Sequence, residues 1–348
     1  MQKTDIKSQT LEELKNTVLE LGEKPFRAKQ LYEWMHVKLA DDFDEMTNLS
    51  KNFRQKLKEN CTLTALKKVE VQISKIDGTR KYLFALSDGN VVESVLMRYH
   101  HGNSVCISSQ VGCKMGCRFC ASTIGGWTRN LTSAEMLDQI YQIQKDSGER
   151  VSNVVVMGTG EPMDNYDHIV RFVHLLSDED GLNISQRNIT VSTCGIVPKI
   201  YELAKEKLQI TLALSLHAPN DEIRRQTMPI ANRYTIGEII QACKYYFDKT
   251  GRRITFEYSM IRGVNDKEEH AKELAGRLSG LNCHINLIPL NEVKERNCYR
   301  STKEDIEKFK TILEKYRKTV TIRREMGSDI DAACGQLRKK FLTKNGRN

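Results

Sequence analysis

The feature that most constrains this fold is an alternation of strand-like and helix-like segments between residues 103 and 324. Apolar, β-branched runs such as SVCISS, VSNVVVMG, NITVST and QITLALSL are each followed by a segment with helical spacing. The same order continues through RRITFEYSM and CHINLIP to a last strand-like run, TVTIRR. Parallel strands need crossover connections, so six such strand–helix units predict an α/β fold with a parallel sheet. We expect a partial (βα)6, TIM-like barrel.

The residues that precede this series follow different patterns. Residues 1–60 have helical periodicity, and Pro25 is placed to begin a second helix. Short strand-like runs follow, separated by Asp-Gly pairs that are typical of hairpin turns. We therefore predict a small N-terminal helical domain (1–60), a β-hairpin region (61–102), a barrel (103–326), and a C-terminal loop with a mobile basic tail (327–348).

Charge and hydropathy narrow the class of protein. The formal net charge is +9, and basic residues predominate at the C-terminal end: Arg317, Lys318, Arg323, Arg324, Arg338, Lys339, Lys340, Lys344 and Arg347. A second basic group comprises Arg224, Arg225, Arg233, Arg252, Arg253 and Arg262. A basic excess attracts nucleic acid, although an ordinary solvated surface is an open alternative. Because no apolar run suits a membrane helix or a secretory signal, we expect a cytoplasmic protein without membrane association.

The chain has ten cysteines, and three of them form a cluster with the spacing Cys113-x3-Cys117-x2-Cys120. In a reducing compartment, clustered cysteines favour metal binding or catalysis over disulfides. Thiolates bind zinc or iron–sulfur clusters, but a structural zinc site normally completes four ligands, and no second pair of this kind follows. Three thiolates suit one [4Fe–4S] cluster with one iron left open.

Polar residues follow the predicted strands at their carboxyl ends, where sites collect in such folds. The glycine-rich segment at 158–161 lets backbone approach a ligand closely, and its terminal carboxylate suits an ammonium group. Hydroxyl, amide and backbone groups at other strand ends can form hydrogen bonds with a polar ligand. The predicted cofactor-binding residues are Gly160, Glu161, Ser192, Ser215, Leu216, His217 and Asn291. As an alternative, these groups only satisfy local backbone at the strand ends.

The motifs and their order carry a family resemblance. The cysteine cluster after the first strand, with Phe119 before its last cysteine, resembles the radical S-adenosylmethionine (SAM) superfamily. CISSQVGC at 106–113, MGTGEPMDN at 157–165, SLH at 215–217, RYTI at 233–236, GVND at 263–266 and DIDAACGQL at 329–337 occur in order along the chain. Together they resemble the RlmN/Cfr family of radical SAM RNA methyltransferases, and the likeness runs through nearly the whole chain.

The resemblance implies a reaction and its RNA substrates. Glu161-Pro162, together with Gly112, is more similar to the RlmN branch. That branch methylates carbon 2 of adenosine 2503 in 23S rRNA, in the peptidyl transferase centre, and of adenosine 37 in tRNA. The alternative is the Cfr-type carbon-8 methylation of the same rRNA adenosine, which confers antibiotic resistance. A radical SAM enzyme for a small molecule or peptide, and a nucleic-acid-binding module with structural zinc, are the competing classes.

The resemblance also assigns roles to isolated residues. It implies that Cys334 carries a methyl group, that Cys106 resolves a protein–RNA adduct through a transient disulfide with Cys334, and that Glu93 accepts a proton. By itself, Glu93 would be interpreted as a solvent-facing strand residue. Two SAM molecules are used per turnover, as methyl donor and radical source. The implied partners are 23S rRNA, tRNA and a one-electron reductant such as flavodoxin, and nothing in the sequence demands more than a monomer.

Overall fold

The computed structural model describes residues 3–293 and 296–344. Its centre is a ten-stranded sheet with the order β14-β13-β12-β11-β10-β9-β6-β5-β4-β3. The strands from β6 to β14 are parallel: β6 (Gly102–Cys106), β9 (Val151–Val156), β10 (Ile189–Thr193), β11 (Thr211–Ser215), β12 (Ile254–Met260), β13 (Cys283–Pro289) and β14 (Thr319–Ile322). The remaining three are antiparallel: β3 (Lys67–Ile73), β4 (Arg80–Ala85) and β5 (Val91–Tyr99).

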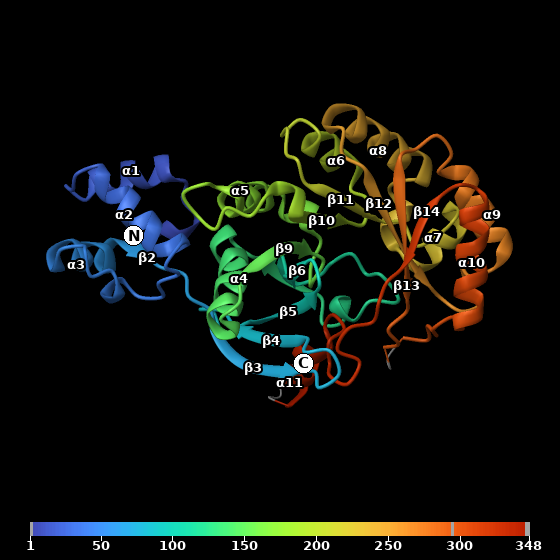
Figure 1. Cartoon of the computed structure of the whole chain (residues 1–348), viewed down its shortest axis with the longest axis horizontal. Helices are drawn as coiled ribbons and strands as arrows, with labels where there is room; N and C mark the ends of the chain where they lie inside the picture. Colours follow the sequence, from blue (N-terminus) through green and yellow to red (C-terminus); the bar gives the residue numbers. More distant parts are fainter. Residues whose placement is uncertain (1–2, 294–295, 345–348) are drawn as a thin grey trace.

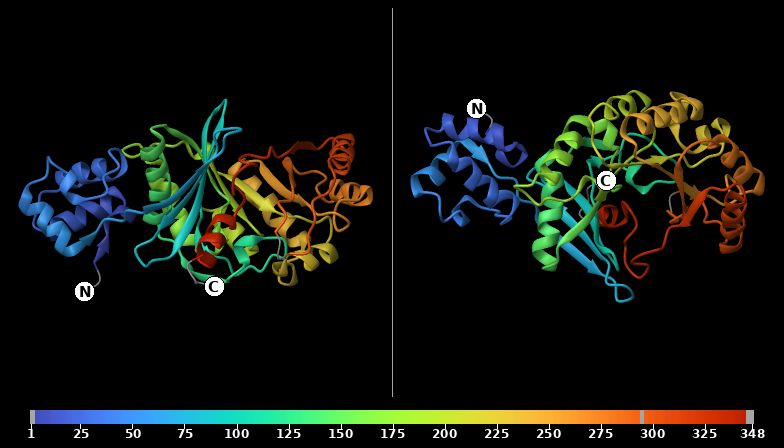
Figure 2. Two further views of the ribbon diagram at one scale, coloured as in Figure 1. Left: turned by 90° about the horizontal axis from the view of Figure 1, so that it is seen from below. Right: turned by 45° about the horizontal axis from the view of Figure 1, so that its top comes forward.

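Helices connect the parallel strands and lie along the outer side of the curved sheet (Figure 2). They are α4 (Ser133–Ser147), α5 (Tyr166–Ser177), α6 (Val197–Leu203), α7 (Asp221–Thr227), α8 (Ile236–Thr250), α9 (Glu268–Arg277) and α10 (Lys303–Lys315). Sequence explains where the two longest begin, because Thr132 and Thr235 each form a capping box with a glutamate three residues on. The sheet ends at β14 and β3 without closing, so the predicted α/β fold with a partial barrel is confirmed.

The two faces of the parallel strands differ in polarity. On β12, Tyr258 packs against Phe309 of α10, with ring centroids 5.2 Å apart, so this side faces the helices. Glu257, the residue before Tyr258, therefore faces the interior of the barrel, because successive side chains of a strand point to opposite faces. Glu257 is aligned with Ser215 on β11 and Asn286 on β13. This polar row prepares the interior for a polar ligand.

Three N-terminal helices lie to one side of the sheet (Figure 1). They are α1 (Leu11–Glu20), α2 (Phe26–His36), which Pro25 precedes as predicted, and α3 (Lys51–Asn60), and β1 (Thr4–Asp5) pairs with β2 (Cys61–Thr62) beside them. Buried polar contacts join this region to α4: the Lys7 Nζ–Asp138 Oδ1 ion pair of 2.7 Å and the His36 Nδ1–Tyr141 Oη hydrogen bond of 2.8 Å. Within the described ranges, no helix has the length and apolar character needed to cross a membrane.

The C-terminal segment differs from the prediction. Instead of a mobile tail after residue 335, the chain forms α11 (Gln336–Lys344). Leu337 is buried against Leu83 and Val91, and Phe341 packs beside it. An isolated helix of this length is marginal in water, so packing on the sheet accounts for its formation. The last residues of the predicted tail, 345–348, which include Arg347, lie outside the described residues.

Candidate active site

The cysteine loop is fastened at both ends. It connects β7 (Gln110–Gly112) to β8 (Trp127–Asn130), which pair in antiparallel fashion. Gly112 has a φ of +77°, and a Cβ there would meet the carbonyl oxygen of Gly126 at 2.0 Å, so this position requires glycine. The Arg118 amide donates to the Thr227 carbonyl of α7 at 2.9 Å. The loop is therefore held in place by backbone contacts.

The three thiols of this loop influence one another. Cys113 is buried, and Cys117 and Cys120 are half-buried. Burial raises the pKa of Cys113 to about 12, and burial with the neighbouring thiols raises the pKa of Cys117. In the described part of the chain, no three His, Cys, Asp or Glu side chains are arranged to hold a single metal ion. A four-iron cluster is wider than one ion and is held by cysteine thiolates, so this donor set suits the cluster better than zinc.

The position of Arg224 supports the assignment of an iron–sulfur cluster to the cysteine loop. It also corrects the expectation that Arg224 belongs to a basic surface. Grouped by sequence with the basic residues that attract polyanions, its side chain is instead completely buried. It donates to the Cys194 carbonyl at 2.6 Å and the Leu216 carbonyl at 3.2 Å, while its Nη1 has no partner in the described structure. A buried charge is costly without an opposite charge. Cys117 lies close enough for its thiolate to stabilise the guanidinium, so an anionic thiolate-bound cluster fits beside it.

A cavity of about 210 Å³ lies at the carboxyl ends of the parallel strands. Cys120 and Cys334 both line it. It brings together four of the residues predicted from sequence to bind a cofactor: Ser192, Ser215, His217 and Asn291. The other three, Gly160, Glu161 and Leu216, do not line it. These four remain candidates for contacts with ribose and adenine.

Glu161 lies beside the cysteine loop. Its carboxylate accepts hydrogen bonds from the amides of Met163 at 3.0 Å and Cys194 at 2.7 Å. Burial raises its pKa, although these amide hydrogen bonds oppose the shift. The negative charge of Glu161 adds to the raised pKa of Cys113 and Cys117, which shows that it is near both thiols. Glu161 is thus a buried acceptor next to the proposed cluster.

The segments around Glu161 and His217 are shaped by close backbone contacts. A Cβ at Gly160, where φ is +121°, would meet the Ser109 hydroxyl at 2.6 Å, so this predicted residue keeps the loop close to the strand ends. Leu216 is buried and contributes the carbonyl that accepts from Arg224. Both residues therefore have backbone roles in the structure, in keeping with the alternative left open by the sequence.

His217 is held as a neutral ring. Its φ is +55°, and its Nδ1 accepts a hydrogen bond from the Ser259 amide at 2.9 Å. Its ring lies against Phe119 with centroids 5.0 Å apart. Burial, and then the charge of Arg224, lower the pKa of His217 to about 3. A neutral imidazole therefore lines the cavity at ordinary pH.

Sequence reasoning missed several lining residues. Glu257 and Ser259 line the same cavity from β12, together with Met157 and Arg323. Burial raises the pKa of Glu257, which accepts a hydrogen bond from Asn286 Nδ2 at 2.8 Å. The alternation within ITFEYSM contained a signal for Glu257 and Ser259, because both polar residues occupy the same face of one strand.

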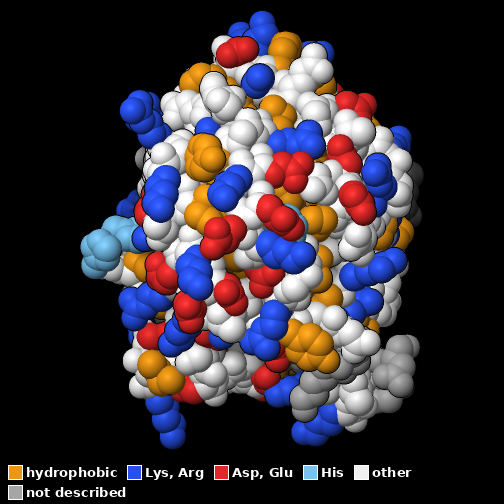
Figure 3. Space-filling model, turned by 90° about the vertical axis from the view of Figure 1, so that its right-hand side faces the viewer, with side chains coloured by type: hydrophobic (Ala, Val, Ile, Leu, Met, Phe, Trp, Pro, Cys, Tyr) orange, Lys and Arg blue, Asp and Glu red, His pale blue; other side chains and the backbone are white. Residues whose placement is uncertain are grey.

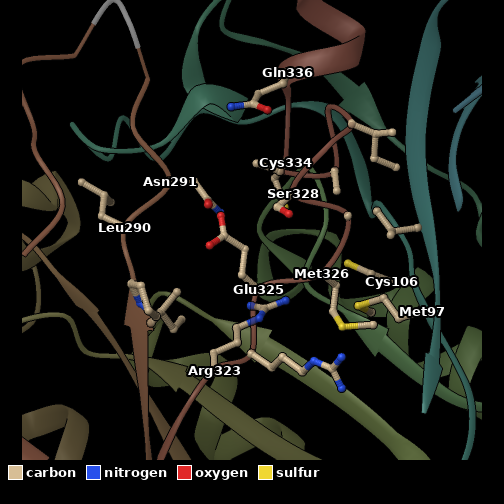
Figure 4. Close-up of a pocket in the computed structure, with 18 of the residues that line it drawn as sticks. Met97, Cys106, Leu290, Asn291, Arg323, Glu325, Met326, Ser328, Cys334 and Gln336 are labelled. Atoms are coloured by element: carbon tan, nitrogen blue, oxygen red, sulfur yellow. The ribbon is translucent and has the colours of Figure 1, made fainter. Parts of the chain in front are cut away.

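A second cavity of about 540 Å³ shares Cys334 with the first. Figure 4 shows Cys334 between Asn291 on one side and Cys106 and Met326 on the other. Both thiols contact the main chain of Met157: Cys334 Sγ donates to its carbonyl at 3.7 Å, and the side chain of Cys106 also forms a hydrogen bond with the Met157 backbone. Cys334 is exposed, whereas Cys106 is buried. Cys334 therefore lies at the junction of the two cavities.

The disulfide implied by the resemblance is not formed in this structure. Cys106 and Cys334 are both free thiols, as are the other cysteines. Burial, followed by the nearby charge of Cys334, raises the pKa of Cys106 to about 12. Cys106 is therefore held as a protonated thiol in this state.

Glu93 is buried rather than solvent-facing, at 3% exposure, which overturns the interpretation of the isolated strand pattern. Its carboxylate pairs with Lys81 Nζ at 2.8 Å. It also accepts hydrogen bonds from the amides of Gly335 at 2.6 Å and Arg338 at 2.5 Å. Glu93 thus directly contacts the segment that contains Cys334.

Comparison with known proteins agrees with this arrangement. Residues 107–275 match the radical SAM superfamily, and residues 4–63 match the ribosomal RNA large subunit methyltransferase N-terminal domain. The chain is similar to the "Probable dual-specificity RNA methyltransferase RlmN" of Lachnoclostridium phytofermentans, at 66% identity over 99% of this chain and 96% of the relative. The protein of that name from Lachnospira eligens is 67% identical over 97% of each chain. The crystal structure of a radical SAM methyltransferase from Sphaerobacter thermophilus is similar, with a TM-score of 0.92 and 44% identity over 96% of this chain and 98% of the other. This chain belongs to the RlmN family of radical SAM RNA methyltransferases.

Proposed function

We propose that this protein methylates carbon 2 of adenosine 2503 in 23S rRNA and of adenosine 37 in tRNA. The observation that carries the proposal is the position of Cys334 at the junction of two cavities. One cavity is lined by Cys120 and four of the predicted cofactor-binding residues, and the other by Cys106. A methyl carrier must face both a cofactor and a substrate, so this position suits Cys334. The names of the curated relatives support RNA as the substrate.

The cofactor side has the groups that radical SAM chemistry requires. Cys113, Cys117 and Cys120 hold one [4Fe–4S] cluster, and Ser192, Ser215, His217 and Asn291 contact SAM, of which two molecules are used per turnover. Carbon 2 of adenine is electron-poor, and the bound cluster with SAM supplies the radical chemistry that methylation of such a carbon needs. Arg224 offsets negative charge beside Cys117.

The substrate side has the residues for carrying and releasing the methyl group. Cys334 carries it on its sulfur, because a thiolate is a strong nucleophile. Glu93 accepts the proton from carbon 2. Once the carried carbon is bonded to carbon 2 and carbon 2 has lost its proton, Cys106 attacks the Cys334 sulfur. The sulfur–carbon bond of the adduct breaks, and the released carbon takes up a proton to become the methyl group of the base. A Cys106–Cys334 disulfide is left, which a reductant must reopen. The shared contact with Met157 keeps the two thiols near each other for this step.

The cavity of about 540 Å³ receives the target adenosine, which must leave its stack to reach the Cys334 sulfur between the two cavities. Arg323 and Arg324 line this cavity and suit phosphate. The face over α9 and α10, in contrast, has interspersed acidic and basic side chains (Figure 3), so it does not favour a polyanion.

The basic residues of the C-terminal helix are not equivalent. Arg338 is half-buried and its Nε donates to the Val91 carbonyl at 3.1 Å, while Lys340 pairs with Asp331 at 2.6 Å. Their first role is to hold the helix in place. We therefore assign phosphate contacts first to Arg323 and Arg324, and we test them by charge reversal. RNA affinity and its dependence on salt should both decrease.

One experiment tests the reaction. The protein with reconstituted cluster is incubated anaerobically with SAM, a one-electron reductant such as flavodoxin, and 23S rRNA or tRNA fragments. Nucleosides are then compared with 2-methyladenosine and 8-methyladenosine standards by mass spectrometry. We expect 2-methyladenosine from both RNAs, made by a monomer. 8-Methyladenosine would identify the carbon-8 reaction instead, and unmodified RNA would contradict the proposal.

A further inference from the structure

Lys81, in the middle of strand β4, has almost no contact with solvent. It is 1% exposed, and lysines are seldom buried without a partner. Its partner is Glu93 on β5, with Nζ and Oε2 2.8 Å apart. In the antiparallel register Lys81 lies opposite Val95, so Glu93, two residues away from Val95, lies on the same face of the sheet. The proposed reaction gives Lys81 no role.

This ion pair holds the main chain on both sides of the methyl-carrying cysteine. Lys81 Nζ donates to the carbonyl of Ala333 at 3.2 Å. The amide of Gly335 donates to Glu93 Oε2 at 2.6 Å. Ala333 and Gly335 are the two neighbours of Cys334 in the chain, so one buried pair fixes both peptide units that flank it.

The side chain of Cys334 contributes little to its own placement. It is exposed, and its thiol has a 3.7 Å contact with the Met157 carbonyl. Its position therefore depends on the main chain. Besides Lys81, the Ala333 carbonyl accepts only a long 3.5 Å bond from the Gln336 amide among the described contacts.

Glu93, in contrast, has further donors of its own. The Arg338 amide in the first turn of α11 donates to Glu93 Oε1 at 2.5 Å, where a negative charge near a helix N-terminus is favourable. Removal of Lys81 would therefore leave Glu93 bound to the helix but release the Ala333 side of the loop. The lysine thus has a function that Glu93 cannot replace.

We propose that Lys81 is a positioning residue for the methyl-carrying cysteine. Its ammonium group fixes the Ala333 carbonyl and orients the Glu93 carboxylate, which keeps the Cys334 sulfur at the junction of the two cavities. This inference rests on the proposed function. A displacement of a reacting group by about 1 Å can lower a rate by about 100-fold, so a residue that touches neither substrate nor cofactor can still control turnover.

The test compares Lys81→Met with Lys67→Met. Methionine keeps the apolar stem of Lys81 but removes its charge and donors, and Lys67 is an exposed lysine on the neighbouring strand β3. With reconstituted enzyme, we expect Lys81→Met to lower kcat for RNA methylation by on the order of 10- to 100-fold with an unchanged KM for RNA. Lys67→Met should match the wild type in both. Because a partly unfolded preparation would also lower the apparent kcat at an unchanged KM, kcat is calculated per folded, cluster-loaded protein, from the cluster absorbance and the unfolding transition of each variant.

A second measurement does not depend on turnover. In the cofactor-free protein, the rate at which N-ethylmaleimide labels Cys334 is followed by peptide mass spectrometry. Lys81→Met should label Cys334 faster than the wild type, while labelling of Cys298 stays the same. If Lys81→Met folds poorly, Lys81→Gln retains a neutral donor and should show the same changes to a smaller degree.

The outcomes separate the inference from the proposed function. Wild-type kcat and wild-type labelling in Lys81→Met would overturn the positioning role, as would a raised KM at unchanged kcat. If the wild type itself made no methylated nucleoside, the proposed function would fail. Faster labelling of Cys334 in Lys81→Met would then still show that Lys81 positions the loop.

Discussion

The two halves of the central sheet build their parts of the site in different ways. In the parallel half, from β6 to β14, candidate residues lie at or just beyond strand ends and meet because neighbouring strands end at the same edge. In the antiparallel half, from β3 to β5, side chains along the strands bind a segment from the other end of the chain. These contacts are Gln72–Asp331, Ser74–Asp329, Lys81–Ala333 and Glu93–Gly335.

This difference teaches how stability is distributed over the site. The cavity of the parallel half is surrounded by packed strands and helices, so its geometry is supported by the core of the fold. The segment around Cys334, residues 327–337, is called the carrier segment. It is held mainly by polar contacts and by a small apolar cluster around Leu337. Segments with few buried apolar contacts open locally at a lower free-energy cost. We expect changes in the parallel half to affect folding, and changes in the antiparallel half to affect turnover.

The largest expected effect is the loss of the carrier itself. Cys334→Ala should reduce methylated adenosine to the background level, because no other described thiol is shared by the two cavities. The brown colour of the cluster should remain, because Cys334 lies outside the cysteine loop. Nucleoside mass spectrometry measures the methylated adenosine, and the visible absorption of the thiolate-bound iron measures the cluster. Cys298→Ala is the control and should retain activity; an active Cys334→Ala would refute the carrier assignment.

The next largest effect tests whether the stability of the parallel half depends on the buried guanidinium of Arg224. Arg224→Met should lower the free energy of unfolding by on the order of 3 kcal/mol, because the buried Cys194 and Leu216 carbonyls lose their donor. Anaerobic urea unfolding measures this change. The matched control is Arg225→Met, on the exposed face of the same helix. Equal stability of the two variants would show that Arg224 does not support this half.

Alanine substitutions at two glycines test whether a change in the carrier segment affects the position of Cys334 rather than the stability of the fold. Gly335 has a φ of +78°, and a Cβ there would meet the Ser122 amide nitrogen at 3.0 Å. Gly280 has a φ of +74° but nothing within 4 Å. Alanine at either position should cost about 1 kcal/mol of stability through backbone strain. Only Gly335→Ala should also lower kcat, by about 10-fold. A similar kcat for both variants would contradict this expectation.

The remaining predictions concern pH and distinguish the two halves. His217 has a pKa lowered from 6.5 to about 3, so the unfolded chain binds a proton that the folded chain excludes between these values. Stability should therefore fall as pH decreases below 6.5, by up to about 1.4 kcal/mol per pH unit. His217→Asn tolerates the left-handed backbone and should make this fall shallower. Unfolding of the cofactor-free protein from pH 7 to 5 provides the measurement, and an unchanged slope would be evidence against it.

The carboxylate contacts of the antiparallel half should be lost only at lower pH. Despite the opposing effect of burial, hydrogen bonds from Gly327 and Thr79 lower the pKa of Asp77 to about 2, and a hydrogen bond from Ser74 lowers that of Asp329. Their contribution is complete above the ordinary value of 3.8 and is lost as pH falls toward 2. The protection factors of the amides of residues 327–335, which correct for the intrinsic pH dependence of exchange, should therefore be unchanged at pH 5 and decrease below pH 4. Lower protection already at pH 5 would contradict this order.

The parallel half could largely be predicted from the sequence. Strand alternation identified the sheet, and the rule for strand ends correctly placed Ser192, Ser215, His217 and Asn291 around one cavity. Leu216, predicted to bind a cofactor through its backbone, stays a prediction: it does not line the cavity, and its carbonyl accepts a hydrogen bond from Arg224. Burial of Arg224 also left no local signal, since an arginine in a charged helix is typical of a surface.

The antiparallel half could not be predicted in this way. Glu93 and Gly335 are 242 positions apart, and no local pattern indicates that their main chain and side chain meet. A mobile tail was predicted where α11 forms, because a short helix depends on the surface that it covers and the sequence does not show that surface. Only the family resemblance connected Glu93 with Cys334, and it contained nothing about Lys81.

The order of the site residues along the chain has a consequence for biosynthesis. All strands of the sheet precede residue 323, so the sheet and the cysteine loop are synthesised before Cys334. Domains fold as units from the N-terminus during synthesis, so the sheet that contains Lys81 and Glu93 can form before the segment around Cys334 reaches it. A product truncated before Cys334 would therefore contain the cysteine loop and a folded sheet but would lack the thiol at the junction of the two cavities.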